Sequence, residues 1–191
     1  SKDIIEGISI VLRLFEKAEA IIGIEDNKPK AIDALSFECN GNNRINVMPL
    51  STRYPQGGER RLISSVTGRQ INSHILPADA GVIVLKIATI IAIYEAVKMN
   101  MPLVHRVVTL TGDGVNEPGN MDVPLGISHK YLADECGGIK DSTVKIISGG
   151  PMMGMAMNSL DYPVIKTSSS ILAITCLLYT SPSPRDMRRS R

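Results

Sequence analysis

The sequence predicts an α/β protein in which helices and parallel strands form layers. Two observations support this fold class. Apolar residues at helical spacing alternate along the first hundred residues with short runs rich in Ile and Val. The 191 residues, 43% of them apolar, also suffice to build a core, which excludes a disordered chain. The order helix, strand, helix, strand, helix is typical of parallel strands joined by crossover helices.

Two helices and two strands are expected in the first fifty residues. Helical spacing of apolar residues predicts the first helix, Pro29 in a first helical turn predicts the second, and short apolar or alternating runs predict the strands. The expected ranges are 3–19 for a helix, 20–24 for a strand, 29 to about 37 for a helix and 44–50 for a strand.

A turn that contains two glycines, at residues 54–59, leads into a third helix that is expected to end at Val66. Residues 83–98 carry apolar residues on one face, which predicts a largely buried helix that closes this part of the chain. The tripeptide Asn100-Met-Pro102 then marks a boundary.

The residues beyond this boundary predict a second, smaller unit. Its pattern is strand, turn, strand, helix and strand, and Ser128 can cap the helix. The expected ranges are 104–110 for a strand, 111–114 for the turn, 122–127 for a strand, 128–136 for the capped helix and 144–154 for a strand that ends in glycines.

The last sixteen residues differ from the rest in composition and periodicity. Residues 176–186 match, codon by codon, the translation of a common transposase sequencing adapter, so we interpret 176–191 as an adapter scar; a basic disordered tail is the alternative. Without its four Arg and one Asp, the chain has 17 basic and 18 acidic residues, and its net charge changes from +2 to −1. The charge therefore does not indicate nucleic acid as a partner.

The cysteines and the absence of common motifs exclude several classes of protein. Cys39, Cys136 and Cys176 are too few and too scattered for a disulfide framework, which fits a reducing compartment. The signatures of zinc ribbons, zincins, P-loops and hydrolase elbows do not occur. No run of eighteen apolar residues occurs, so we expect a soluble or peripheral protein whose true start was removed by processing or truncation.

The turn Tyr54-Pro-Gln-Gly-Gly-Glu59 is the best candidate for a binding site. Gly57 and Gly58 allow a ligand to approach the backbone, and the free N–H groups at the start of the next helix favour anionic groups. Glu59 could bind a ribose or a ring nitrogen, and Tyr54 offers a face for stacking. An acidic first turn is also ordinary complementation of the helix dipole, so the spacing alone leaves both interpretations open.

Other polar and glycine-containing segments give weaker indications. Residues 111–120 carry Asp, Asn and Glu oxygens without EF-hand spacing, which favours a hairpin turn over a calcium loop. Residues 148–154 could form a backbone nest for an anion or a glycine corner between domains. His74, His105 and His129 lie on different expected elements without a partner at ligand spacing, so no metal site is expected.

Taken together, eight segments resemble one family, the C subunit of the Rnf ion-translocating electron transport complex. The resemblance extends in order over residues 1–175. Its first segment is Tyr-Pro-Gln-Gly-Gly-Glu-Arg-Arg-Leu-Ile, and the complete set is 54–63, 67–69, 76–82, 92–97, 106–115, 118–120, 147–154 and 171–175.

The resemblance implies three structural regions. Residues 1–100 would be the C-terminal part of a Rossmann-like, flavin- and NADH-binding α/β domain, like that of the NADH-oxidising flavoprotein of respiratory complex I. Residues 103–156 would form a small β-grasp domain of the soluble-ligand-binding type (SLBB). Residues 157–175 would connect it to an iron–sulfur domain.

The resemblance also implies cofactors and site residues. In the flavoprotein family a Tyr five residues before a Glu lines the dinucleotide pocket, which assigns cofactor binding to Tyr54, Gly57, Gly58 and Glu59. FMN and NAD(H) would bind the parent protein. Its glycine-rich phosphate loop would precede residue 1, and two 4Fe-4S clusters would follow residue 175, so the chain is expected to be an inactive fragment.

One residue departs from the family pattern. Family members usually read Val-Gln-Asn-Val-Gly-Thr at the positions of residues 84–89, so Lys86 replaces an amide expected near the flavin. This substitution puts direct flavin contact from the segment in doubt, although a cation there could also stabilise reduced flavin.

The implied function is electron transfer between NADH and ferredoxin through flavin and iron–sulfur clusters. The protein would be a peripheral subunit at the cytoplasmic face of the bacterial inner membrane, with ferredoxin and the other Rnf membrane and iron–sulfur subunits as partners and no nucleic acid. Two alternatives stay open: the corrinoid reductase of bacterial microcompartments, and a non-catalytic scaffold like the A subunit of the sodium-pumping quinone reductase.

Overall fold

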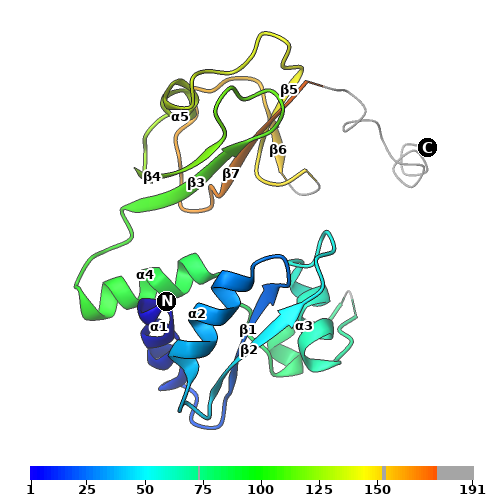
Figure 1. The fold of residues 1–191 in the computed structure, drawn as a ribbon, viewed down its shortest axis with the longest axis vertical. Coiled ribbons are helices and arrows are strands. Elements are labelled where there is room, and N and C mark those ends of the chain that lie inside the picture. Colours follow the sequence, from blue (N-terminus) through cyan, green and yellow to red (C-terminus); the bar gives the residue numbers. More distant parts are fainter. Residues whose placement is uncertain (73, 152–153, 176–191) are drawn as a thin grey trace. The chain divides into compact units, whose positions relative to one another are not determined.

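The computed structural model describes residues 1–72, 74–151 and 154–175 (Figure 1). The chain divides into two compact units, unit 1 (residues 1–102) and unit 2 (residues 103–191). Near the division, Asn100 adopts a positive φ of 54°. The expected adapter scar at 176–191 lies outside the described residues. No helix of the described part is both long enough and apolar enough to cross a membrane.

Unit 1 is built on a pair of parallel strands. β1 (Ala20–Glu25) pairs with β2 (Ile45–Leu50), and Ala20 lies opposite Ile45. The other elements are α1 (Lys2–Leu12), α2 (Pro29–Cys39), α3 (Glu59–Thr67), the 3-10 turn η1 (Pro77–Ala80) and α4 (Ile87–Lys98). The predicted order of helices and strands and the predicted parallel pairing are confirmed.

The two faces of this sheet contact different helices (Figure 1). Ile22 and Ile45 are buried in a core that includes residues of α1, α2 and α4. Successive residues of a strand point to opposite faces, so Gly23 faces the other side. A Cβ on Gly23 would lie 3.1 Å from Leu62 Cδ1 of α3. The sheet therefore separates α1, α2 and α4 from α3.

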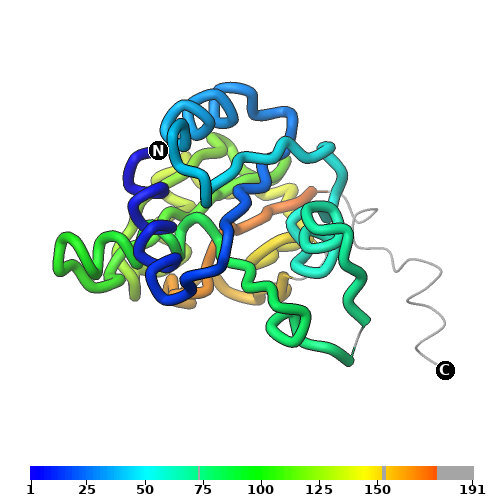
Figure 2. The backbone as a smooth tube through the Cα atoms, turned by 90° about the horizontal axis from the view of Figure 1, so that it is seen from below, coloured from blue at the N-terminus to red at the C-terminus, as the bar shows by residue number. Residues whose placement is uncertain are grey.

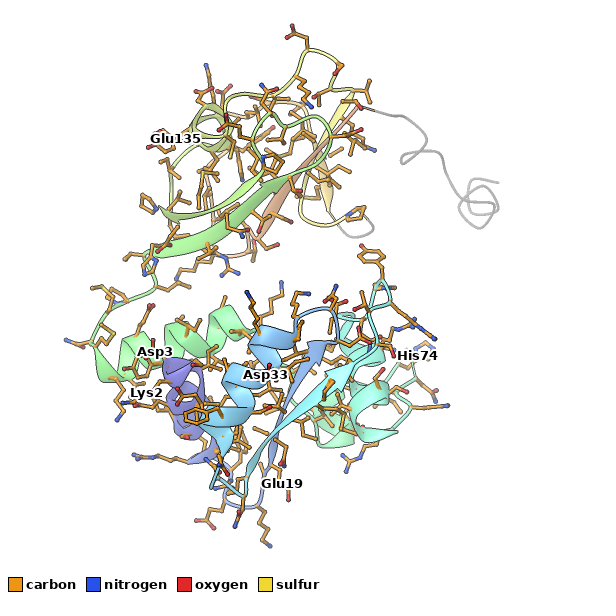
Figure 3. The ribbon with its side chains drawn as sticks, in the orientation of Figure 1. Lys2, Asp3, Glu19, Asp33, His74 and Glu135 are labelled. Carbon is orange, nitrogen blue, oxygen red and sulfur yellow. The ribbon has the colours of Figure 1, made fainter. Side chains whose placement is uncertain are left out.

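Helices α1 and α4 lie side by side (Figures 1 and 2). Gly7 makes this close approach possible, because a Cβ at this position would lie 2.5 Å from the carbonyl oxygen of Ile90. The pKa of the Tyr94 phenol on α4 is raised, first by burial and then by the negative charges of Asp3 and Glu6 on α1. Asp3 is labelled in Figure 3, at the start of α1.

Helix α1 ends at Leu12, so the prediction of a helix as far as residue 19 was wrong. Arg44 explains the path of the chain after the helix. Its Nη2 donates to the carbonyl oxygens of Phe15 and Ala18 at 2.5 and 2.8 Å, and its Nε donates to Ala18 at 3.0 Å. A guanidinium that binds free carbonyls beyond a helix end replaces the hydrogen bonds that further helical turns would make.

Helix α4 begins at Ile87, four residues later than predicted, and Ile90 is its only buried residue. Residues 82–86 are not helical, and Lys86 has extended backbone angles, φ −73° and ψ 147°. The reason is the run of β-branched residues at 82–84, which favours extended backbone. The expectation of a largely buried helix is therefore wrong for most of α4.

The described residues of unit 2 form a five-stranded sheet of order β4-β3-β7-β5-β6 and one helix. Its elements are β3 (His105–Thr111), β4 (Gly119–Pro124), α5 (His129–Glu135), β5 (Lys145–Ser148), β6 (Met155–Met157) and β7 (Ser170–Ile174). Leu132 of α5 packs in one core with Val108, Leu110, Ile171 and Ala173. The predicted cap of α5 is confirmed, because Ser128 Oγ accepts a hydrogen bond from Tyr131 N at 3.3 Å.

Several bounds in unit 2 differ from the predictions. The second strand runs over Gly119–Pro124 instead of 122–127, and the strand expected at 144–154 ends at Ser148 because Gly149 takes a left-handed φ of 104°. The segment 157–175, which was expected to be a connector, includes β7. β7 runs parallel to β3 on one side and antiparallel to β5 on the other.

The hairpin predicted for residues 111–120 is confirmed, because β3 and β4 pair antiparallel, with Leu110 opposite Gly119. Asp113 in this turn accepts hydrogen bonds from Thr175 N and Oγ1. These bonds lower the pKa of the Asp113 carboxyl. The turn oxygens thus serve a contact with the chain that follows β7.

Candidate functional site

The candidate site lies where the two strands of unit 1 end. Because β1 and β2 are parallel, their last residues, Glu25 and Leu50, lie at the same edge of the sheet. Glu19, labelled in Figure 3, precedes β1 and marks the opposite edge. Ligands of open α/β sheets bind at the carboxyl ends of the strands, and the segment that follows β2 carries all four predicted site residues.

Hydrogen bonds join the segments that follow the two strands. Thr52 donates to Asp26 Oδ1 from its Oγ1, at 2.6 Å, and from its backbone N, at 3.1 Å. Asp26 N donates to Leu50 O at 2.8 Å. The bonds from Thr52 hold the pKa of Asp26 below its ordinary value. They also fix the start of the loop that leads to Tyr54.

The turn itself is anchored by Gln56, which sequence reasoning missed. Gln56 is 7% exposed; its Nε2 donates to Ser65 Oγ at 3.1 Å, and its Oε1 accepts from Arg61 Nε at 3.2 Å. Gly58 N donates to Pro55 O at 3.0 Å, and the Tyr54–Pro55 peptide is cis. A polar residue between a proline and a glycine is ordinarily expected to be exposed. Nothing in the sequence therefore indicated that Gln56 is buried and anchors the turn.

The structure brings the four predicted site residues together: Tyr54, Gly57 and Gly58 lie in one turn, and Glu59 is the first residue of α3. Tyr54 is 63% exposed, and Glu59 is also exposed. A Cβ on Gly57 would have no atom within 4 Å, whereas one on Gly58 would lie 3.2 Å from Pro55 O. No side chain caps the N-terminus of α3. A ligand can therefore reach the Gly57 backbone, the Tyr54 ring and the Glu59 carboxylate.

This arrangement offers three kinds of interaction. The uncapped N-terminus of α3 favours a phosphate or another anion. The exposed Arg53, which directly precedes Tyr54 in the sequence, adds a positive charge. The Tyr54 ring can stack on a planar ring. Glu59 can accept hydrogen bonds from hydroxyl groups. The combination suits a nucleotide, which has a phosphate, a sugar and a planar base.

Lys86, the residue that departs from the family pattern, is not part of this turn. It is the exposed N-cap residue of α4, and its side chain makes no capping hydrogen bond.

The described residues offer no site for a metal. No group of three or more His, Cys, Asp or Glu among them could hold a metal ion. Cys39 and Cys136 are free, buried and in different units. Burial raises the pKa of both thiols, so neither is a reactive thiolate at neutral pH.

Comparison with known proteins assigns both units. Residues 1–95 match the family described as the Nuo51 FMN-binding domain, and residues 107–156 match the SLBB domain. The chain is 46% identical over 175 residues to the C subunit of the proton-translocating ferredoxin:NAD(+) oxidoreductase complex of Clostridium ljungdahlii. The chain is thus a homologue of these C subunits over most of its length. The resemblance seen in the sequence motifs is thereby confirmed.

Other C subunits match at lower identity. That of the Na(+)-translocating ferredoxin:NAD(+) oxidoreductase complex of Acetobacterium woodii is 38% identical over 175 residues, and that of the ion-translocating oxidoreductase complex of Cronobacter sakazakii is 37% identical over 170 residues. These alignments and that of the Clostridium protein cover 89–92% of the chain but only 38%, 40% and 22% of the Clostridium, Acetobacterium and Cronobacter proteins. The chain thus spans less than half the length of these relatives.

Proposed function

We propose that this chain is part of a peripheral protein that passes electrons between NADH and ferredoxin through flavin and iron–sulfur clusters. The observation that supports this most strongly is the position of Tyr54, Gly57, Gly58 and Glu59. They form one accessible turn at the carboxyl edge of a parallel sheet, within the segment that matches an FMN-binding domain.

The residues of this turn fit the nucleotide part of NADH. The α3 N-terminus would bind the pyrophosphate, Glu59 would accept hydrogen bonds from ribose hydroxyls, and Tyr54 would stack on a ring. The open space above Gly57 leaves the backbone accessible to the ligand. FMN, when bound, supplies the hydride and one-electron chemistry, and the residues of this chain position the nucleotide.

The iron–sulfur clusters are proposed for a region of the full-length protein outside the described residues, because the described part has no cluster of cysteines. In this proposal unit 2 has a β-grasp fold, and unit 1 is the later part of a Rossmann-like domain. Ferredoxin and the other subunits of the complex are the partners, at the cytoplasmic face of the membrane. The names of the relatives, which are subunits of ion-translocating complexes, support these partners.

The test is fluorescence titration of the full-length protein with FMN and with NADH. We expect saturable binding of both, and weaker NADH binding by about tenfold or more in Glu59→Gln, because a charged acceptor is replaced by a neutral one. Glu38→Gln is the matched control, because Glu38 is also exposed and lies near the C-terminal end of α2. The affinity of the Glu38→Gln protein for NADH should be unchanged.

A folded full-length protein that binds neither FMN nor NADH contradicts the proposal and supports the non-catalytic scaffold. If Glu59→Gln leaves the affinity for NADH unchanged, the result contradicts the assigned site but not the proposed function. Oxidation of NADH with an artificial acceptor then distinguishes an active enzyme from a protein that only binds the nucleotides.

A further inference from the structure

Asp26 connects the ends of the two strands of unit 1 at the edge that carries the candidate site. It is the first residue after β1, and its backbone N donates to the carbonyl oxygen of Leu50, the last residue of β2, at 2.8 Å. Its Oδ1 accepts hydrogen bonds from Thr52 Oγ1 at 2.6 Å and from Thr52 N at 3.1 Å. One residue thus holds the segment that leaves β2.

The Asp26 side chain lies outside the core. Asp26 and Thr52 are both exposed, and neither belongs to the buried cluster of unit 1. A hydrogen bond between groups that water can reach contributes only about 0.5–1.5 kcal/mol to the free energy of unfolding. The main effect of these bonds is therefore local: they determine where the chain runs after β2.

The segment that carries Tyr54 is fixed at both ends. Thr52 is bonded to Asp26 at one end, and the buried Gln56 is bonded to two side chains of α3 at the other. Tyr54 lies two residues from each of these anchors, and its side chain is 63% exposed. Because packing does not hold an exposed ring, the two anchors of the backbone set the position of the ring.

Preorganisation of this kind affects the affinity for a ligand. A segment held only at Gln56 would sample more conformations, and a ligand that needs one of them would have to order the chain itself. Gly57 and Gly58, which follow Gln56 directly, allow many backbone conformations. The turn therefore depends on its hydrogen bonds for a single conformation.

We propose that Asp26 is a positioning residue of the candidate site: through Thr52 it holds the turn 54–59 in the conformation that binds the nucleotide part of NADH. This inference rests on the proposed function, because it takes NADH as the ligand of the turn. The role needs a hydrogen-bond acceptor at Oδ1 and no contact between Asp26 and the ligand. A neutral Asn at this position, whose Oδ1 also accepts hydrogen bonds, should therefore serve nearly as well.

Titration of the full-length protein with NADH, followed by fluorescence, tests the proposal. Asp26→Ala should weaken binding about tenfold, because the ligand must then order a segment that the protein no longer holds. Thr52→Val keeps the shape of the side chain and the backbone hydrogen bond but loses the hydroxyl, and it should weaken binding about threefold. Asp26→Asn and Thr52→Ser should stay within about twofold of the unaltered protein, because both keep the hydrogen bonds.

Glu25→Gln is the matched control. Glu25 is the last residue of β1, next to Asp26, and its carboxylate pairs with Lys28 at 2.9 Å instead of with Thr52. The substitution removes a negative charge from the same edge of the sheet and leaves the anchor intact. The affinity of the Glu25→Gln protein for NADH should be unchanged.

Two further measurements separate positioning from a loss of folded protein. In steady-state oxidation of NADH with an artificial acceptor, Asp26→Ala should raise KM more than it lowers kcat, whereas partial unfolding lowers kcat and leaves KM unchanged. In a protein that already carries Tyr54→Ala, the further substitution Asp26→Ala should weaken binding less than it does in the unaltered protein, because the ring that Asp26 positions is gone.

If Asp26→Ala and Thr52→Val bind NADH as tightly as the unaltered protein, the inference is wrong and the proposed function is not affected. Equal losses in Asp26→Asn and Asp26→Ala would indicate direct contact between the carboxylate and the ligand, and independent effects of Asp26→Ala and Tyr54→Ala would show that Asp26 does not act through the turn. Either result overturns the inference. If Asp26→Ala does not fold, Thr52→Val and Thr52→Ser decide. A folded full-length protein that does not bind NADH contradicts the proposed function itself, and this inference with it.

Discussion

Gly112 packs directly against the backbone of Ala173. A Cβ on Gly112 would lie 1.9 Å from the carbonyl oxygen of Ala173, and the φ of Gly112 is +112°. Ala173 belongs to β7, which lies between β3 and β5 in the sheet of unit 2. The turn after β3 therefore fits against β7 only because residue 112 has no side chain.

Gly112→Ala should lower the free energy of unfolding of unit 2 by about 3 kcal/mol or more, because it combines a backbone clash with a strained φ. Chemical denaturation followed by circular dichroism measures the change. Gly119→Ala is the control in the same hairpin, since a Cβ there has no atom within 4 Å. Equal effects of the two substitutions would show that the contact with Ala173 is not the cause.

Gly7→Ala should destabilise unit 1, although helix propensity alone predicts a gain of about 1 kcal/mol. The new methyl group would meet the Ile90 carbonyl oxygen at 2.5 Å and push α1 away from α4, at a cost of about 1–3 kcal/mol. Thermal unfolding measures the sign of the change. Ser9→Ala, on the same helix, serves as the control for propensity, and a stabilised Gly7→Ala protein would disprove the close packing.

Gly57→Ala should leave stability within about 0.5 kcal/mol and weaken nucleotide binding. The protein has room for the methyl group, because no atom lies within 4 Å of it, but a ligand in contact with this backbone does not. Titration of the full-length protein with NADH, together with its melting temperature, separates the two effects. Unchanged affinity at unchanged stability would place the ligand elsewhere.

Unit 2 should lose stability as the pH falls below about 6.5, the ordinary pKa of histidine. His129 is 3% exposed, neither of its ring nitrogens has a hydrogen-bond partner among the described residues, and burial lowers its pKa. Between the lowered pKa and the ordinary one, His129 is therefore protonated in the unfolded chain and neutral in the folded chain. The loss should approach about 1.4 kcal/mol per pH unit until the lowered pKa is reached.

His129→Leu should remove this part of the pH dependence and keep stability near pH 7.5, because it replaces a buried ring without hydrogen bonds by an apolar side chain. Unfolding free energies of both proteins at pH 7.5 and 5.0 provide the comparison. The same loss between these pH values in the variant would assign the dependence to another group.

Local sequence patterns predicted most elements of unit 1, because the signals that locate each of these strands and helices lie within the element itself. Pro29 and the apolar run at β1 are sufficient to locate α2 and its preceding strand. The errors arose where a distant residue decides the structure. Arg44 donates to the carbonyl oxygens of Leu12 and Phe15, and nothing within residues 3–19 indicates that contact.

The site shows the same division between local and distant signals. Tyr54 and the two glycines mark a turn by their types alone, so the sequence placed the turn correctly. Gln56 acts through Ser65 and Arg61, nine and five residues away, and its burial depends on the fold of α3. β7 escaped prediction for a related reason: it pairs with β3, about sixty residues earlier, and a short apolar run carries no signal of its partner.

The position of β7 also sets the order in which the chain can fold during synthesis. β3 and β4 can pair as soon as their hairpin leaves the ribosome, and β5 and β6 can pair later without help from either. These two hairpins stay separate until residues 170–174 emerge and bridge them. Translation must therefore proceed beyond Ile174 before unit 2 has a continuous core, whereas β1 and β2 are complete once Leu50 has emerged.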